Sequence, residues 1–280
     1  ITIKKMKNSY LITGGTGSFG KAFLKDLIKS KSTISRLVIF SRDEFKQSQL
    51  QAEYPKNKYP FLRFFLGDIR DLDRLTRAMD NVDFVFHAAA LKHVPVIEYN
   101  PFEAIKTNVQ GSQNVIDAAL FQNVEKVICI GTDKAVSPLN TYGATKLLME
   151  KLFVTAGNYL DQRKHKTKFL ALRYGNVLGS SGSVIPKFID QVKAGKKLSI
   201  TDPSMTRFSI TMDQALEFIL SSVIMSKGSE VFIPKIKAYD IETVKEAMKG
   251  LFDNVKDIKI PVRQGEKYHE TLINADELKY

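Results

Sequence analysis

The amino-acid sequence predicts an α/β fold, a doubly wound parallel sheet with helices on both faces and a smaller C-terminal lobe. Three observations predict it. Short, nearly continuous apolar runs recur along the chain, helix-period segments separate them, and a glycine-rich turn follows the first run. Strands buried on both faces of a parallel sheet have this apolar pattern. Helix-length segments between such strands are typical of βαβ units.

Strands and helices alternate in the order that this fold requires. The apolar runs predict strands at Tyr10–Thr13, Leu37–Ser41, Phe61–Leu66, Phe84–His87, Val127–Ile130 and Phe169–Tyr174. The helix-period segments predict helices at Ser18–Ile28, Glu44–Ala52, Leu72–Met79, Phe102–Leu120 and Thr141–Tyr159.

The alternation changes after about Gly175, where a Gly- and Ser-rich segment begins. Two further helices are expected at Ile185–Ala194 and Met212–Ser226, with a loop TDPSMTRF between them and shorter strands after them. We therefore predict a dinucleotide-binding domain over residues 1–175 and a mainly substrate-binding lobe over 176–280. Neither a low-complexity linker nor an internal repeat marks the boundary, so we expect crossing segments and one compact body with a cleft.

Composition excludes several classes of protein. The chain has 280 residues, 44% of them hydrophobic, which is too apolar for a disordered chain. Its single cysteine, Cys129, lies in an apolar run and allows neither an internal disulfide nor a zinc cluster, so we expect a cytoplasmic protein without a metal site. No apolar stretch approaches the roughly 18 residues of a membrane span. The N-terminal run ITIKKMKNSYLITGG leads directly into a strand, which argues against a secretion signal.

The formal charge of +12 fits a nucleic acid, an acidic membrane face or a small phosphorylated ligand. The basic clusters IKKMK, RKHKTK and KAGKK are scattered and lack interleaved aromatic residues. We therefore expect small phosphates as partners, with no nucleic acid and no membrane.

A turn with glycines at every third position follows the first predicted strand and opens the first helix. Such glycines let the backbone turn sharply and approach a pyrophosphate, while the helix N-terminus offers free N–H groups to it. This context predicts a dinucleotide site rather than a plain structural turn. The candidate residues of this turn are Gly14, Thr16, Gly17, Ser18, Phe19 and Gly20.

The second strand ends in Ser41-Arg42-Asp43, where dinucleotide-binding proteins read the ribose 2′ position. Arg42 offers a guanidinium for a 2′-phosphate, and Lys46 lies four residues on, so we favour NADP over NAD. The alternatives are a solvated Arg42, an N-cap for Asp43 and a turn or cap for Asp68, which could also lie near adenine. The remaining candidate cofactor-binding residues are Ile69, Ala88, Ala89, Ala90, Asn108, Tyr142 and Lys146.

Tyr142 and Lys146 lie four residues apart on a predicted helix and so share a face. A neighbouring ammonium and an oxidised nicotinamide both favour the phenolate, which makes the tyrosine a usable base. Thr132, at the end of a strand, is placed to hydrogen-bond the same substrate hydroxyl. With the glycine turn, this ordered set resembles the extended short-chain dehydrogenase/reductases, which have a Rossmann domain, over nearly the whole chain.

Asp133 and Lys134 directly follow Thr132, and they narrow the range of reactions to consider. A sugar-nucleotide 4,6-dehydration oxidises C4, removes the C5 proton, expels the C6 hydroxyl and returns the hydride to C6. Besides Tyr142 it needs one more acid and one more base, and Lys134 needs a lowered pKa to act as the base. An adjacent Asp–Lys pair in a solvated loop is the alternative.

At this level of detail the sequence resembles the inverting UDP-N-acetylglucosamine 4,6-dehydratases. The matching strings include ITGGTGSFGKAF, GDIRDLDRL, HAAALKHVPVIEYNPFEAIKTNVQG, GTDKAVSP with YGATK, RYGNVLGSSGSVIP, MTRFSIT and RQGEKYHE. The resemblance implies C5 inversion to a 2-acetamido-2,6-dideoxy-L-arabino-hexos-4-ulose. It implies that Lys134 takes the C5 proton, that Asp133 assists loss of the C6 hydroxyl, and that Tyr142 removes the C4 hydroxyl proton.

A UDP-sugar also needs cations for its diphosphate and polar contacts for uridine. The candidate substrate-binding residues are Lys92, His93, Asn176, Arg207, Arg263 and Glu266, each of which could instead be an ordinary surface residue. We expect a homo-oligomer. A UDP-sugar 4-epimerase and a non-catalytic nucleotide-binding scaffold remain as alternatives. Asp133-Lys134 argues against the epimerase, and the intact catalytic set argues against the scaffold.

Overall fold

The computed structural model describes residues 9–29, 34–158, 160–161, 163–180 and 182–279. Its main sheet has the strand order β10-β6-β5-β4-β1-β2-β3, and every pair in it is parallel. The order reverses between β1 and β4, and open α/β sheets bind ligands at that point. The strands are β1 (Ser9–Thr13), β2 (Arg36–Ser41), β3 (Leu62–Leu66), β4 (Phe84–His87), β5 (Lys126–Ile130), β6 (Lys168–Leu172) and β10 (Glu230–Phe232).

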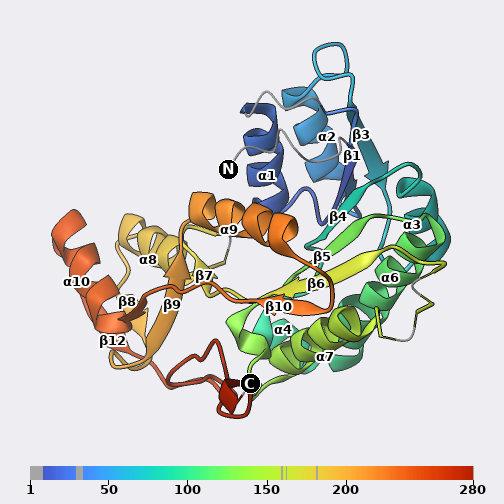
Figure 1. Cartoon of the computed structure of the whole chain (residues 1–280). Helices are drawn as coiled ribbons and strands as arrows, with labels where there is room; N and C mark the ends of the chain where they lie inside the picture. The colour runs from blue at the N-terminus through green and yellow to red at the C-terminus, as the bar shows by residue number, and fades with distance from the viewer. Residues whose placement is uncertain (1–8, 30–33, 159, 162, 181, 280) are drawn as a thin grey trace.

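Helices cover both faces of this sheet, as Figure 1 shows. Alternate residues of β1 enter opposite cores: Tyr10 and Ile12 pack with α1 and α9, whereas Leu11 packs with α3, α6 and α7. This two-sided burial confirms the predicted fold class. The helices are α1 (Ser18–Lys29), α2 (Glu44–Glu53), α3 (Leu72–Ala78), α6 (Gly111–Phe121), α7 (Thr141–Thr155) and α9 (Met212–Met225).

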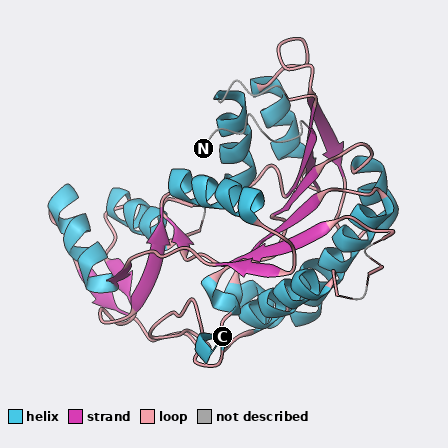
Figure 2. Cartoon of the chain, in the orientation of Figure 1, coloured by secondary structure: helices cyan, strands magenta, loops and turns pink. Residues whose placement is uncertain are grey.

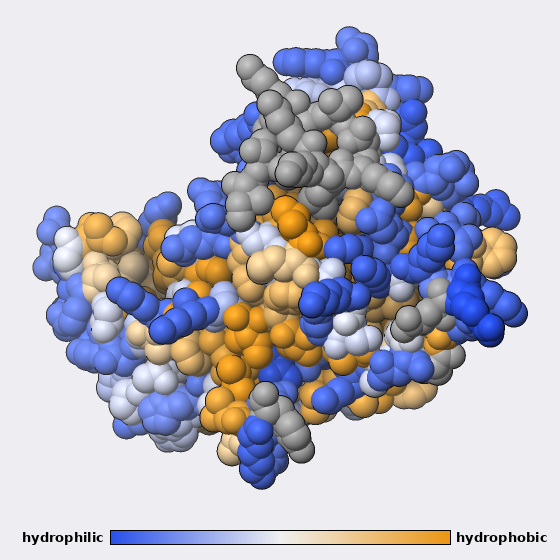
Figure 3. Space-filling view, in the orientation of Figure 1, coloured by the Kyte–Doolittle hydropathy of each residue, from blue (hydrophilic) through white to orange (hydrophobic). Residues whose placement is uncertain are grey.

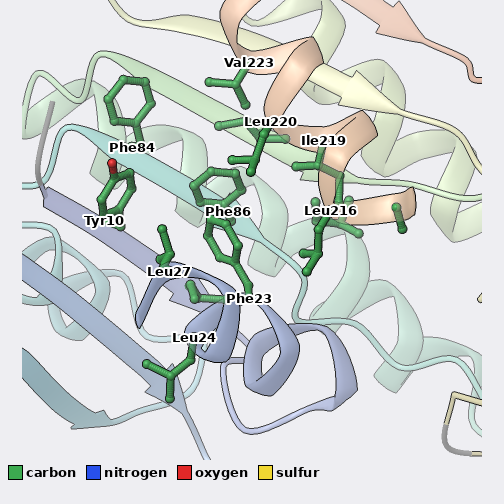
Figure 4. Close-up of a cluster of buried hydrophobic side chains, with 14 of the residues drawn as sticks. Tyr10, Phe23, Leu24, Leu27, Phe84, Phe86, Leu216, Ile219, Leu220 and Val223 are labelled. Carbon is green, nitrogen blue, oxygen red and sulfur yellow. The ribbon is translucent and has the colours of Figure 1, made fainter. Parts of the chain in front are cut away.

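Helix α9 belongs to the main sheet although it comes late in the chain. Figure 4 shows Leu216, Ile219, Leu220 and Val223 of α9 beside Phe86 of β4, next to α1. The following strand, β10, then pairs with β6. Residues 212–232 therefore return from the predicted lobe to the main sheet, and a boundary at residue 175 stays a prediction.

The predicted helix Phe102–Leu120 is a composite. It consists of α5 (Pro101–Ala104), a π-helical segment (Ile105–Gln110) and α6, and an unpredicted helix, α4 (Val94–Tyr99), precedes it. Pro101 lacks an N–H and holds Asn100 outside the helical region, which separates α4 from α5. The helix predicted at Thr141–Tyr159 ends at Thr155, and residue 159 lies outside the described residues.

The smaller lobe has its own sheets and its own core (Figure 2). Strands β7 (Asn176–Val177), β9 (Thr206–Ile210) and β11 (Ala238–Asp240) form one sheet, and β8 (Leu198–Ile200) pairs with β12 (Asp257–Lys259). Helices α8 (Val184–Lys193) and α10 (Ile241–Leu251) pack on them. Asn176, expected in the Gly- and Ser-rich segment, and Arg207, expected in the loop TDPSMTRF, therefore lie on strands.

Residues 266–277, called the C-terminal segment below, run back along the main domain. A buried arginine at the end of β6 anchors its far end: Arg173 binds Glu150 of α7 and Glu277, each with a closest N–O distance of 2.6 Å. Arg173 also donates to the carbonyl oxygen of Leu272. Because a planar guanidinium binds carboxylates bidentately, this network fixes the segment in one orientation.

Within the described ranges, none of the helices is both long enough and apolar enough to cross a bilayer. Figure 3 shows apolar side chains gathered across the middle of the viewed face, over α9, with hydrophilic ones along the outer edges. Cys129 is a buried residue of β5, as predicted, and burial raises the pKa of its thiol to about 12. The basic run IKKMK lies outside the described residues.

Candidate active site

The glycine turn lies at the point where the strand order reverses. Gly14 has φ +66°, and a Cβ there would come within 3.0 Å of the Cα of Ala89, after β4. A Cβ on Gly20 would overlap the carbonyl oxygen of Gly15. The side chain of Thr16 hydrogen-bonds that of Ser41 over 2.8 Å, tying the turn to the end of β2. The backbone cradle at the start of α1 therefore fits a dinucleotide pyrophosphate.

Arg42 lies beyond the end of β2 with a side chain that is 56% exposed. Its nearest carboxylate, Asp68, is 3.7 Å away and is shared with Arg70, which binds Asp68 at 2.8 Å. Lys46 instead pairs with Asp43, and the Asp43 side chain caps α2 by accepting from the Lys46 backbone N–H. The helix-cap alternative for Asp43 is confirmed, and Lys46 points to that cap.

Asn108 supports the loop after β4. Its side-chain oxygen accepts from the backbone N–H of Leu91, and its amide group donates to the Leu91 carbonyl and to Thr145. Asn108 is fully buried. Its two hydrogen bonds to the Leu91 backbone hold the loop that carries Ala88, Ala89 and Ala90. The π-helical segment presents it there.

His87 is a structural residue. Its two ring nitrogens hydrogen-bond Thr13 and Ser112, and its ring stacks on Phe153. Burial, helped by the charge of Lys146, lowers the pKa of His87 to about 3. The neutral ring braces β4 against α6 and α7.

Tyr142 and Lys146 lie on the first turns of α7, against the end of β5. The Lys146 ammonium is buried and donates to the carbonyl oxygen of Ile130 over 2.9 Å. Burial lowers the pKa of Lys146, and burial raises that of Tyr142, although Lys134 and a hydrogen bond with Thr132 act in the opposite direction on the tyrosine. The cationic ring of an oxidised nicotinamide, bound beside Tyr142, would also favour the phenolate.

Asp133 and Lys134 form a direct ion pair in a short 3₁₀ turn, Asp133–Ala135, after β5. The Lys134 ammonium donates to Asp133 over 2.8 Å and to the side-chain oxygen of Asn176 over 3.0 Å. Asp133 is fully buried, accepts from the Thr132 hydroxyl over 3.0 Å and leaves its second oxygen without a partner. Asp133 therefore lies in the protein interior with Lys134 partly exposed beside it, and the pair does not lie in a solvated loop.

Lys134 carries a pKa shift opposite to the one a resting general base needs. Burial lowers its pKa, but the charges of Asp133 and Glu270 outweigh burial, so the pKa of Lys134 is raised. The lowered pKa expected from the sequence is wrong for this arrangement, because two carboxylates face the ammonium. Lys134 is held as the protonated partner of Asp133.

Glu270 is the residue at this site that sequence reasoning missed. It lies on the C-terminal segment, its side chain is only 6% exposed, and one carboxylate oxygen is 3.8 Å from the Lys134 ammonium. The string RQGEKYHE contains it, but nothing local distinguishes it from a solvated glutamate. Only the return of the C-terminal segment to the main domain brings it to Lys134.

The other candidate substrate residues divide into two groups. Arg207, on β9, pairs with Glu266 at 3.1 Å, and the charges of exposed Arg263 and of Glu266 both act on Lys187 of α8. These residues form a mainly cationic group in the smaller lobe. Asn176 belongs with Lys134 instead.

Lys92 and His93 precede α4, on the main-domain side. His93 is the residue before the first turn of α4, and its ring lies against Gly182 of the smaller lobe. Both side chains are exposed, and burial of part of the Lys92 side chain lowers its pKa. A pocket of about 450 Å³ lies between residues 137–139 and the C-terminal segment, and the catalytic candidates do not line it.

Comparison with known proteins places the chain. Residues 10–280 match the model of the family described as "Polysaccharide biosynthesis protein". The chain belongs to this family. A relative from Campylobacter jejuni, named UDP-N-acetylglucosamine 4,6-dehydratase (inverting), is 47% identical over 272 residues, which cover 97% of this chain and 79% of the relative. The resemblance to such dehydratases stated from the sequence is confirmed.

Other family relatives carry a different name. One from Rickettsia conorii, named UDP-glucose 4-epimerase, is 44% identical over 271 residues, 96% of this chain and 78% of the relative. Among solved structures, Pen from Bacillus thuringiensis has a TM-score of 0.91 and 42% identity, covering 98% of this chain and 84% of that one. DesIV, a dTDP-glucose 4,6-dehydratase from Streptomyces venezuelae, has a TM-score of 0.82 at 21% identity, covering 95% and 88%; it shares the fold.

Proposed function

We propose that this protein is a sugar-nucleotide 4,6-dehydratase that acts on UDP-N-acetylglucosamine and inverts C5. The product would be a UDP-2-acetamido-2,6-dideoxy-L-arabino-hexos-4-ulose. The buried Asp133–Lys134 pair beside Thr132 carries the proposal, since it adds an acid and a base to the groups that oxidise C4. The name of the Campylobacter relative supports the same substrate.

Oxidation at C4 falls to Tyr142, which takes the hydroxyl proton. Thr132 holds that hydroxyl, and its hydrogen bond to Tyr142 and the charge of Lys134 favour the phenolate. Lys146, fixed on the Ile130 carbonyl, is assigned to the same step. A nicotinamide dinucleotide bound at the glycine turn would accept the C4 hydride and later return it to C6.

Elimination falls to the Asp133–Lys134 pair. The C4 ketone acidifies the C5 proton, Lys134 takes that proton, and Asp133 protonates the C6 hydroxyl as it leaves as water. The pair therefore has to begin with its shared proton on Asp133, and the 2.8 Å hydrogen bond between the two groups is the path for that transfer. After elimination the same hydrogen bond returns a proton from Lys134 to Asp133. As the hydride returns to C6, a solvent-derived proton adds to C5 from the opposite face, and Tyr142 releases the C4 hydroxyl proton to solvent. Each turnover then leaves the pair unchanged.

The diphosphate and uridine are assigned to the smaller lobe. Arg207, Arg263 and Glu266 supply cations and a ribose acceptor there, while Lys92 and His93 border the sugar from the main domain. Asn176, which binds Lys134, orients the base toward the sugar. The protein would work in the cytoplasm as a homo-oligomer. Two exposed aromatic side chains, Tyr99 at the end of α4 and Phe102 in α5, support self-association.

A test with UDP-N-acetylglucosamine, NADP⁺ and deuterated water separates the dehydratase from the epimerase. We expect a 4-keto-6-deoxy product with deuterium at C5, because the C5 proton leaves and a solvent-derived proton replaces it. NMR of the product measures both features. The names of the Rickettsia relatives favour the second candidate, a UDP-sugar 4-epimerase. A C4 epimer without a keto sugar would establish that candidate and exclude the dehydratase.

NADP is the proposed cofactor, on the ground that Arg42 is exposed beside the end of β2 and that Asp68, 3.7 Å away, binds Arg70 more closely. Replacing Arg42 by alanine is expected to weaken NADP⁺ binding about tenfold or more, since a charge-assisted contact to the 2′-phosphate is lost. NAD⁺ binding should change by less than about twofold. Isothermal titration with both dinucleotides measures this. Arg77→Ala, at an exposed site on α3, is the control, and equal losses for NAD⁺ and NADP⁺ in Arg42→Ala would contradict the assignment.

A further inference from the structure

Four charged side chains alternate in sign at the catalytic turn. Asp133 binds Lys134 at 2.8 Å, Lys134 lies 3.8 Å from one oxygen of Glu270, and the other oxygen of Glu270 lies 3.7 Å from the Lys267 ammonium. All four side chains are largely shielded from water, with exposures of 0%, 28%, 6% and 12% in the same order. Charges this close interact strongly when solvent is excluded.

The C-terminal segment contributes the last two members and is held at both ends. Near its start, the Lys267 ammonium donates to the carbonyl oxygen of Val136, just after the catalytic turn. Just before it, the Gly265 carbonyl accepts from the Asn140 side chain, which also caps α7. At its far end, Arg173 binds Glu277. These contacts fix Glu270 where it faces Lys134.

Glu270 is a buried carboxylate that the steps assigned above do not use. Its second oxygen, Oε2, makes no hydrogen bond in the described structure, and its nearest cation is Lys267. A buried carboxylate with so few hydrogen bonds is costly unless nearby cations compensate. Lys134 and Lys267 are the two cations that do so.

We propose that Glu270 is a positioning residue that holds the Lys134 ammonium against Asp133 and sets the pH at which Lys134 gains and loses its proton. The proposal rests on the proposed dehydratase function, in which Lys134 is the C5 base. Glu270 transfers no proton in this scheme. It stabilises the positive charge that Lys134 acquires when it takes the C5 proton, and it keeps that ammonium from leaving the site.

The groups that face Lys134 come from four elements, and each has a defined effect. Asp133 of the catalytic turn and Glu270 of the C-terminal segment favour the ammonium, and Tyr142 of α7 adds to them when it is a phenolate. Asn176 of β7 is neutral and accepts one hydrogen bond from it. Lys267 offsets part of the Glu270 charge. Removing Glu270 should therefore lower the pKa of Lys134, and removing Lys267 should raise it.

Competitive labelling with acetic anhydride, read by mass spectrometry across pH, reports the protonation of Lys134 without any turnover. We expect Glu270→Gln to lower the Lys134 midpoint by about one pH unit and Lys267→Met to raise it. Glu270→Asp keeps the charge and should stay near the wild type. Exposed Lys196 is the internal reference, and Glu242→Gln on α10 is a control at a carboxylate distant in sequence and outside the site.

The pH dependence of elimination is the second readout. If Glu270 sets the Lys134 pKa, the acid limb of the pH–rate profile of Glu270→Gln moves to lower pH by the same amount as the labelling midpoint. KM should change by less than about twofold. Equal labelling midpoints in wild type and Glu270→Gln would overturn the proposal even if the variant were slow. If wild type yields no keto sugar, the proposed function fails, and the labelling result still decides whether Glu270 controls Lys134. Lys267→Met keeps the test decisive if Glu270→Gln does not fold.

Discussion

Lys134→Ala is expected to reduce formation of the 4-keto-6-deoxy product by roughly 10²- to 10⁴-fold, the usual contribution of a general base. C4 oxidation should persist, because Tyr142, Lys146 and Thr132 remain. The variant should therefore accumulate reduced cofactor with an oxidised sugar that does not proceed. Product NMR measures the elimination, and nicotinamide absorbance measures the hydride transfer.

Two further variants make this result interpretable. Lys134→Met retains the side-chain bulk beside buried Asp133, so it should resemble Lys134→Ala if the amine is what matters. Lys196→Ala removes an exposed lysine of the smaller lobe and should be fully active. Wild-type turnover by Lys134→Ala would show that another group takes the C5 proton.

Arg173→Ala is expected to destabilise the protein by about 3–5 kcal/mol, because it leaves the buried carboxylate of Glu150 without its partner. The side chains of Arg173 and Glu150 are only 3% and 2% exposed. For a chain of this size the midpoint of thermal unfolding should fall by on the order of 10 °C. Urea unfolding at neutral pH gives the free energy, and limited proteolysis should find the C-terminal segment cleaved sooner. Arg163→Ala, which removes a 90% exposed side chain paired with Asp161, should change stability by less than about 1 kcal/mol.

The same anchor predicts how stability depends on pH. Hydrogen bonds from Arg173 lower the pKa of Glu277 from 4.5 to about 2. Because the folded pKa is the lower one, the stabilisation is fully present above pH 4.5 and is lost as the pH falls toward 2. The difference in unfolding free energy between wild type and Glu277→Gln should therefore shrink over that range. A constant difference would show that the charge of Glu277 contributes nothing.

Local sequence patterns were sufficient to predict most strands and helices of the main domain. The run Phe84–His87 coincides with β4, and each of the other predicted strands differs from the observed one by at most two residues at either end. A strand buried on both faces needs apolar residues at consecutive positions, and that requirement is visible without knowing its neighbours. The catalytic turn and the start of α7 are also close in sequence, so Thr132, Asp133, Lys134 and Tyr142 could be grouped in advance.

Features that depend on distant segments were not predictable. The Pro101 break and the π-helical segment place Asn108 against the loop after β4, a contact that helical periodicity does not encode. Likewise, α9 has an ordinary apolar face, and only packing shows that it covers the main sheet. The expected direction of the Lys134 pKa was wrong because the charge of its neighbour Asp133 and that of Glu270, which comes from the far end of the chain, together outweigh burial.

The sequence by itself determined the fold class, the glycine cradle and the identity of the catalytic candidates, because each depends on spacing within one strand, turn or helix. The tertiary structure decided the charge around them. It paired Arg207 with Glu266 and brought Glu270 to Lys134. The physical reason is burial. The sequence shows that a residue is a carboxylate but not whether it lies in water or in the interior, and only in the interior does its charge act strongly on a neighbour.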